Sequence, residues 1–468
     1  MKIIDRLSSL FGVQDMTVGR PMDTLIAFSI PLLIGNFAQQ LYNTVDSIIV
    51  GQYIGDTALA AVGTSGPILN LMLVLFMGIS TGASILSAQY FGAKDRYTLS
   101  KLVGSTFFLT LASGLLMSVI GFLSTGYLVT LVKPPENVAN GAVTYLQIIF
   151  IGMTGAAAYN ILSGVLRGMG DSVYPLFFLV ISCITNIVLD IIFVKNLGLG
   201  IAGVAWATII AQALSGILCS IRLLRMKEQI DIHRDIFIPD RMLIRRLVKL
   251  GFPAGITSAI FSMSAIVVQN LTNSMGELTI AATVAVMRVD GFAMMPNFTF
   301  GTAATTFVGQ NIGAEKLERV RPGTHDLLKI ALICSSALVL CILLFGHSLI
   351  GMFTQTETVV ALGATGLRWQ AAGYIAFAVS QVLQGVMRGA GETVIPMWIS
   401  VLSTIVLRMP LAYGIAYLTV SEVWPNGHPI ALFSSLLISW VLSMVLTLVI
   451  YKQGNWKKHL PQAFRSVL

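Results

Sequence analysis

The chain has 468 residues, of which 55% are hydrophobic and only 11% are charged, whereas a soluble protein of this length carries about a quarter charged residues. The mean hydropathy of +0.82 therefore excludes a water-soluble globular protein and predicts an all-α integral membrane protein. The formal net charge of +8 is expected to lie in loops that face the cytoplasm and the lipid headgroups, and not to bind nucleic acid.

Twelve apolar segments are long enough to cross a bilayer as helices. The first six lie near 25–52, 58–90, 101–123, 141–166, 173–194 and 201–221, and the second six near 250–275, 280–311, 327–353, 365–387, 394–419 and 429–451. With both termini in the cytoplasm, the external loops hold only Lys133, Lys195 and Arg368 out of 29 basic residues. This bias follows the positive-inside rule and predicts cytoplasmic N- and C-terminal segments.

The first span carries a single polar stripe. Gln39, Asn43 and Asp46 follow one another at helical spacing, with Tyr42 beside them. A carboxylate at membrane depth is energetically costly and persists mainly where it faces a cavity or binds a cation. The stripe therefore predicts contact with an ion or a substrate, with hydrogen bonding to Asn or Tyr for helix packing as the alternative.

The fifth and sixth spans carry polar pairs of the same spacing. Asn186 and Asp190 are one helical turn apart, and so are Thr208 and Gln212. At about 1.5 Å per residue, Asp46, Asp190 and Thr208 all lie about 7 to 13 Å below the outer ends of their helices. We expect one layer of oxygen ligands here, in which the two acids either share a proton or bind Na⁺ together with Asn186 and Thr208.

Two blocks of sequence occur twice. The segment SAQYFGAKD from Ser87 matches VGQNIGAEK from Val308, and GVLRGMGDSVYP from Gly164 matches GVMRGAGETVIP from Gly385. Both matches have the same offset of 221 residues, which indicates a duplication into two pseudo-symmetric lobes of six helices each. We expect a lead-in at 1–24, a first lobe at 25–221, a cytoplasmic linker at 222–249, a second lobe at 250–451 and a C-terminal tail at 452–468.

The second lobe lacks the intramembrane acids of the first at the matching positions. The repeat partner of Asp46 falls at Val267 or Val268, and that of Asp190 is Leu411. This difference weighs against cation coupling in the second lobe, because a valine or leucine offers no ligand to an ion.

Basic and methionine side chains of the second lobe are candidates for substrate contact. Arg288, which is two residues from Asp290, and Arg408 lie within spans, where structural pairing and substrate contact are both open. The methionines of the span near 280–311 are expected either to repack around ligands of different shape or to face lipid and neighbouring helices. The expected cavity residues are Gln39, Tyr42, Asn43, Gln212, Met287, Arg288, Met294 and Arg408, and the expected bend points are Pro31, Pro253 and Pro296.

The duplicated pattern resembles the MATE (multidrug and toxic compound extrusion) family of the MOP flippase superfamily. The resemblance rests on Q-x-x-G-A at Gln89 and Gln310, and on R-G-x-G-[DE] at Arg167 and Arg388. In members of the DinF-like bacterial and archaeal type, the ion-coupling site has an acid in helix 1, an Asn-x-x-x-Asp in helix 5 and a threonine in helix 6. The resemblance implies an ion-coupling role for the matching residues Asp46, Asn186, Asp190 and Thr208, with Tyr42 one turn before the first acid.

No H-E-x-x-H or P-loop motif occurs in the chain, so neither an enzyme nor an ATP-driven pump is expected. We expect a secondary antiporter in a prokaryotic cytoplasmic membrane that exports amphipathic, cationic organic compounds by alternating access. H⁺ or Na⁺ would be the exchanged ion, without another cofactor, and the protein would act as a monomer in contact with lipid and small organic substrates. A flippase for lipid-linked or polysaccharide precursors is the alternative within the superfamily, and a membrane-embedded enzyme or assembly scaffold is the alternative of another class.

Overall fold

The structure is a computed structural model that describes residues 12–132, 134–231, 234–454 and 456–457. Within these ranges the secondary structure is helical and holds no strand. Parts of the predicted loops and end segments, among them residues 1–11, 133 and 458–468, lie outside the described residues.

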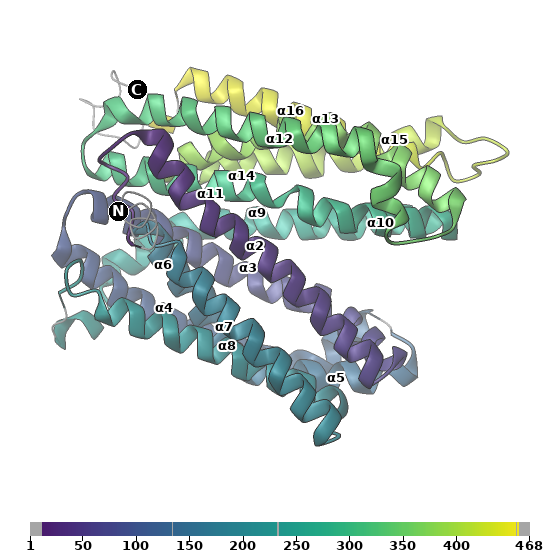
Figure 1. The fold of residues 1–468 in the computed structure, drawn as a ribbon, viewed down its shortest axis with the longest axis horizontal. Coiled ribbons are helices and arrows are strands. Elements are labelled where there is room, and N and C mark those ends of the chain that lie inside the picture. The colour runs from purple at the N-terminus through teal and green to yellow at the C-terminus, as the bar shows by residue number, and fades with distance from the viewer. Residues whose placement is uncertain (1–11, 133, 232–233, 455, 458–468) are drawn as a thin grey trace, which may run out of the picture. The chain divides into compact units, whose positions relative to one another are not determined.

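Each predicted span corresponds to one helix or to a short series of helices (Figure 1). The first six spans are α2 (Pro21–Tyr53), α3 (Asp56–Gly92), α4 (Arg96–Val132), α5 (Glu136–Ile151) with α6 (Met153–Gly168), α7 (Val173–Asp190) with η1 (Ile191–Asn196), and α8 (Gly200–Arg225). The second six are α9 (Arg241–Ser274), α10 (Glu277–Ala293) with α11 (Met295–Gly313), α12 (Val320–Gly351), α13 (Glu357–Gly389), α14 (Val394–Ser400) with η4 (Val401–Arg408) and α15 (Met409–Leu418), and α16 (Ile430–Gln453). The short 3-10 turns η2 (Arg234–Phe237) and η3 (Leu317–Arg319) precede α9 and α12.

Ten of the described helical segments are long and apolar enough to cross a membrane. Helices α5 and α6 meet at a bend of 55° and together qualify as an eleventh span. Helix α13 has 33 residues but is less apolar, because it contains three glutamines and two arginines. With α13 as the twelfth, the predicted all-α fold of twelve transmembrane helices is confirmed.

The described residues group into two compact units. Unit 1 is built on Ile26–Gly255, and unit 2 on Ile256–Ile312 and the chain from Lys316 onward. Helices α2 and α9 each contribute residues to both units, because the unit boundaries fall within them. The remaining helices up to α8 belong to unit 1, and those from α10 onward belong almost wholly to unit 2 (Figure 1).

The turn before α7 contains the acid of the first repeated motif. Gly170 has a φ of +90°, a left-handed conformation that favours glycine. Asp171 is buried, its Oδ1 accepts a hydrogen bond from the Tyr174 N–H at 3.1 Å, and its Oδ2 pairs with Arg222 at 3.0 Å. Burial raises the pKa of Asp171, although the hydrogen bonds and the charge of Arg222 oppose this change. This capped turn fixes the residue at which α7 begins.

The turn before α14 repeats this arrangement with a longer acid. Gly391 has a φ of +89°. Glu392 Oε1 accepts hydrogen bonds from the N–H groups of Val394 and Ile395 at 2.8 and 2.9 Å. The R-G-x-G-[DE] motif is therefore a helix-capping turn, in which glycine supplies the backbone geometry and the acid supplies the cap.

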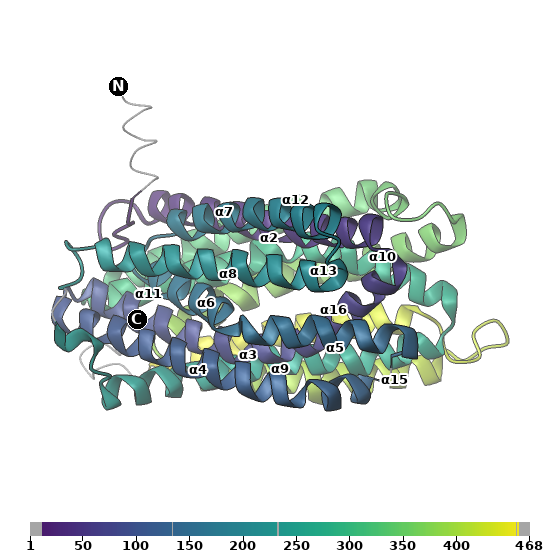
Figure 2. The same ribbon diagram turned by 90° about the horizontal axis from the view of Figure 1, so that it is seen from below.

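Helices α7 and α8 lie side by side in unit 1 (Figures 1 and 2). The Ser182 hydroxyl donates to the Ala211 carbonyl at 2.7 Å and joins the two helices. Further along, Val50 of α2 shares a buried apolar cluster with Val204 and Ile209 of α8. These contacts hold the polar residues of α2, α7 and α8 in one region.

The core of unit 2 is built around α13. The rings of Tyr374 and Phe377 each lie 5.4 Å from the Trp440 ring of α16, measured between centroids. The Ser439 hydroxyl of α16 donates to the Ser403 carbonyl of η4 at 2.8 Å. Helix α16 therefore links the π-helical segment η4 to the aromatic core.

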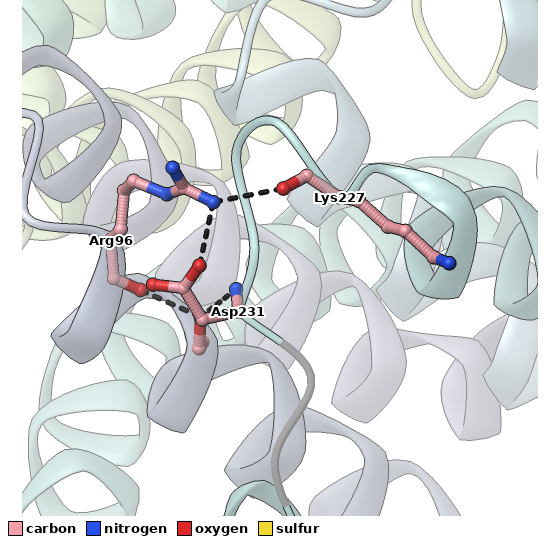
Figure 3. Close-up of polar contacts among 4 residues, drawn as sticks. Arg96, Lys227 and Asp231 are labelled. Atoms are coloured by element: carbon pink, nitrogen blue, oxygen red, sulfur yellow. Dashed lines mark hydrogen bonds and ion pairs between the residues drawn. The ribbon is translucent and has the colours of Figure 1, made fainter.

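The segment that follows α8 is attached to the start of α4 (Figure 3). Arg96 Nη2 contacts Asp231 Oδ1 at 2.6 Å and the Lys227 carbonyl at 2.8 Å, and the Asp231 N–H donates to Ser100 Oγ at 2.8 Å. Because the Arg96 and Asp231 side chains are 47% and 41% exposed, their ion pair stabilises the fold by no more than about 1 kcal/mol. Part of the predicted linker is therefore an ordered element of unit 1.

Candidate functional site

Three helices of unit 1 bring the predicted ion-coupling residues together. Asp46 lies on α2, Asn186 and Asp190 lie in the C-terminal part of α7, and Thr208 lies on α8. The carboxyl groups of Asp46 and Asp190 are within hydrogen-bonding reach of each other. Asp190 is fully buried, and Asp46 is half-buried with its Oδ1 atom shielded from solvent, so two acids from distant parts of the sequence form one largely buried carboxyl pair.

Asn186 connects Asp190 to α8. With its amide oriented so that both polar atoms are satisfied, the Asn186 nitrogen donates to Asp190 Oδ2 at 3.0 Å, and its oxygen accepts from the Thr208 backbone N–H at 3.2 Å. The Thr208 hydroxyl donates to the Val204 carbonyl of its own helix at 2.9 Å. Thr208 therefore takes part through its backbone, while the lone pairs of its hydroxyl oxygen stay available to an ion.

One oxygen of each acid lacks a hydrogen-bond partner among the described residues. Oδ1 of Asp46 and Oδ1 of Asp190 are both buried without a donor. Tyr42 and Tyr145 are close enough to both acids to interact electrostatically. A buried carboxylate oxygen without a donor is costly, and either a proton or a metal cation would satisfy it.

The other predicted polar residues of unit 1 surround this pair less tightly. Gln39 Nε2 donates to Asn43 Oδ1 at 3.4 Å, so the two amides contact each other along the exposed stripe of α2. Gln212 is half-buried one turn beyond Thr208. The structure thus brings the four expected ion-coupling residues together and places these amides beside them on the same helices.

Both units carry a π-helical segment beside an ionisable side chain. Asp190 is the last residue before η1, and Arg408 is the last residue of η4. Pro410 is the second residue after η4, and its ring and missing N–H disrupt the normal bonding of the preceding turn, which explains the wider helix there. Such π-turns are frequent at functional sites.

The predicted substrate residues of unit 2 are not gathered at one point. Met287 and Arg288 have exposed side chains on α10. Met294 lies at the break between α10 and α11 and packs against the core that contains Tyr374. Arg408 is instead buried for the greater part, and its Nη1 donates to Ser264 Oγ at 3.3 Å.

A polar cluster in unit 2 was missed by the sequence reasoning. Asp290 Oδ1 accepts hydrogen bonds from Gln370 Nε2 at 2.6 Å and from the Tyr374 hydroxyl, and Arg408 interacts with Asp290 electrostatically. Gln370 and Tyr374 are one helical turn apart on α13. That spacing, which also pairs Asn186 with Asp190, was the signal available in the sequence.

The three prolines expected to be bend points lie in different settings. Pro31 and Pro253 are buried inside the continuous helices α2 and α9. Pro296 is the second residue of α11, directly after the break at Met294. Each proline removes one backbone donor, so bending at these positions remains a prediction with a local physical cause.

Comparison with known sequences supports the internal duplication. The family model MatE matches residues 31–192 and again residues 253–414. The probable multidrug resistance protein YoeA of Bacillus subtilis is 30% identical over 441 residues, which cover 92% of this chain and 93% of that protein. The probable multidrug resistance protein NorM of Thermotoga maritima is 24% identical over 440 residues, with 93% of each chain covered.

Solved structures share the fold. A structure described as MATE in complex with MaL6 has a TM-score of 0.87 at 23% identity, and the match covers 94% of this chain and 98% of that one. A transporter of the MOP superfamily from Pyrococcus furiosus also has a TM-score of 0.87 at 23% identity, with 96% and 99% covered.

Proposed function

The chain belongs to the MatE family of membrane transporters, and from this membership we propose that it is a secondary efflux antiporter of the multidrug type. It exports amphipathic, mainly cationic organic compounds in exchange for H⁺ or Na⁺. The observation that carries the proposal is the buried pair of Asp46 and Asp190, each with one carboxyl oxygen that has no donor. A membrane-embedded enzyme or assembly scaffold does not fit a transporter family.

The pair supplies the exchange by charge balance. When both acids are ionised, their negative potential attracts an organic cation, but their mutual repulsion is unfavourable. A proton shared by the carboxyl groups, or a Na⁺ bound with the Asn186 and Thr208 oxygens, removes that potential and releases the cation. The four expected ion-coupling residues and the adjacent amides would thus serve two competing ligands.

Helix α2 is the element proposed to move. It carries Asp46 and contains Pro31 within its length, so a change at the carboxyl pair acts on a helix that is already weakened at one turn. We place the protein in a cytoplasmic membrane as a monomer with both termini inside, supported by the positions of the basic residues.

The test is transport by the purified protein in lipid vesicles. Dye efflux is measured under an imposed pH gradient and, separately, under a Na⁺ gradient, which identifies the ion. Asp46→Asn and Asp190→Asn should each abolish gradient-driven efflux, because an amide cannot exchange charge with the gradient. The control is Asp56→Asn, the same substitution at an exposed residue at the start of α3. Wild-type rates in the two site variants would refute the proposal, and transport of lipid-linked precursors without any dye efflux would favour the flippase alternative.

A further inference from the structure

The polar cluster of unit 2 contains a cation whose hydrogen-bonding capacity is largely unused. A guanidinium group has five N–H donors. Arg408 uses Nη1 for a bond of 3.3 Å to Ser264, whereas its Nε is buried and has no partner among the described residues. Arg408 forms no ion pair with Asp290 within the described part of the chain, although the two interact electrostatically.

Asp290, by contrast, is already provided with donors. Its Oδ1 accepts from Gln370 at 2.6 Å and from the Tyr374 hydroxyl. The acid is therefore held by α13, while the arginine on η4 is left with one buried donor, Nε, that no group in the described part of the chain satisfies. An arginine kept only for packing would leave this cost uncompensated.

We propose that Arg408 binds the carboxylate group of an amphipathic, zwitterionic substrate, which makes unit 2 an anion-recognising subsite of the transporter. A carboxylate matches the planar arrangement of the guanidinium donors and would satisfy the buried Nε. The inference rests on the proposed transport of organic compounds and adds a second substrate class to the cations expected at the acid pair of unit 1.

Charge balance links this binding to a proton. In the free site, the charges of Asp290 and Arg408 cancel. A bound carboxylate would leave the group formed by Asp290, Arg408 and that carboxylate with one net negative charge at membrane depth, which is costly, unless Asp290 takes up a proton. The titratable groups that face Asp290 are Tyr374 from α13 and Arg408 from η4, and Arg408 stays charged, so Asp290 is the proton acceptor. The carboxylate should therefore bind more tightly as the pH falls.

Two dyes that differ only in this group provide the probe. Rhodamine 110 has a free carboxylate and rhodamine 123 is its methyl ester, and their binding to the purified full chain is measured by fluorescence anisotropy over a pH series. Arg408→Gln should weaken rhodamine 110 binding about 10- to 100-fold, the loss expected for a charged hydrogen-bonded pair, and change rhodamine 123 binding less than about threefold. Arg368→Gln is the matched control, because this exposed arginine lies on α13 and should leave the binding of both dyes unchanged.

The Asp290→Asn variant tests whether Asp290 takes up the proton that accompanies carboxylate binding at Arg408. It should keep the preference for the free acid but remove the pH dependence, which in the wild type reaches about tenfold per pH unit. If Arg408→Gln does not fold, the double variant with Asp290→Asn keeps the cluster neutral and should no longer distinguish the two dyes. Unchanged rhodamine 110 binding in the arginine variants, or a persistent pH dependence in Asp290→Asn, overturns the subsite. The transport proposal fails separately, if neither dye is moved by an ion gradient in vesicles.

Discussion

Asn186 donates a hydrogen bond to Asp190 Oδ2 at 3.0 Å, one turn away on the same helix. The opposite end of the same amide accepts from the Thr208 backbone at 3.2 Å. A single side chain therefore orients the carboxyl group and joins α7 to α8. The amide makes both contacts in only one orientation. The orientation of Asp190 therefore depends on the distance between α7 and α8.

Asn186→Ala should impair coupling more than it impairs folding. The variant removes the donor to Asp190 and one of the oxygens proposed to bind Na⁺, so the apparent Na⁺ affinity should fall about tenfold, the loss expected for a hydrogen bond to a charged group. With H⁺ as the coupling ion, the affinity should rise instead, because the ionised carboxyl group loses a stabilising donor. Ion titration of vesicle transport measures the effect. Ser182→Ala is the control, since it also deletes an α7–α8 hydrogen bond but leaves the carboxyl pair intact; equal losses of ion affinity in both variants would mean that Asn186 acts only in helix packing.

Asp190→Asn should make the protein more stable while it abolishes transport. In the absence of bound ion, replacing one of two adjacent carboxylates removes their repulsion and the cost of a buried charge. We expect an unfolding midpoint a few degrees higher, equivalent to about 1 to 2 kcal/mol. Thermal unfolding in detergent without Na⁺ at neutral pH measures this gain, and a lower midpoint would show that the ionised carboxyl group supports the fold.

Asp171→Ala should destabilise unit 1, because it removes the cap of α7 and leaves Arg222 without its partner. The expected cost is about 2 to 4 kcal/mol, against about 1 kcal/mol or less for Arg96→Gln, which breaks an exposed pair. Denaturant titration compares the two. A similar loss of unfolding free energy in both variants would contradict the larger stabilising contribution expected from the buried turn.

The titration of Asp171 gives this comparison a pH dependence of known sign. Burial raises the pKa of the folded carboxyl group above its usual 3.8, so the folded state binds this proton more readily than the unfolded state. The part of its stability contribution that depends on this proton is therefore fully present below pH 3.8 and is lost as the pH rises through the raised value, while the cap and the pairing with Arg222 remain. Asp171→Asn should remove that part of the pH profile.

Gly104→Ala should loosen the segment that follows α8. An added Cβ at Gly104 would lie 1.8 Å from the Ile236 carbonyl oxygen, so the backbone of that segment would have to move. Limited proteolysis should cut the region around Ile236 faster in this variant. Gly126→Ala is the matched control on α4, where the added methyl meets nothing within 4 Å and should be neutral or stabilising by up to about 1 kcal/mol. Equal protection of the segment in both variants would count against the close contact.

The helices could be predicted because apolar runs of membrane length leave little choice of structure. The unit 1 site could also be predicted from the sequence. The spacing of Asn186 and Asp190 places them on one face of a helix, and an acid within a membrane span is energetically costly and therefore indicates a function. The part played by Thr208 could not be predicted, since its hydroxyl bonds within α8 and its N–H makes the contact. Every residue except proline has a backbone N–H, so the sequence does not indicate which N–H group will make such a contact.

The cluster around Asp290 shows a different limit. Helical spacing indicates which face of α10 carries Asp290 and which face of α13 carries Gln370 and Tyr374, but it does not say that those two faces meet. In the sequence, the basic residue nearest to Asp290 is Arg288, on the same helix. The side chain of Arg288 is exposed, whereas the electrostatic partner of Asp290 is Arg408, from a helix far along the chain.

The capped turns before α7 and α14 also determine how far along each helix Asp190 and Arg408 lie. Asp190 lies nineteen residues after the Asp171 cap and Arg408 sixteen after the Glu392 cap, or roughly 28 and 24 Å of helix. An insertion of one residue within α7 before Asn186 would turn that amide and Asp190 together by about 100° and move them about 1.5 Å along the axis. A substitution before Asn186 therefore leaves the facing of the acid unchanged, whereas a change in the length of this stretch turns the acid away from its partners.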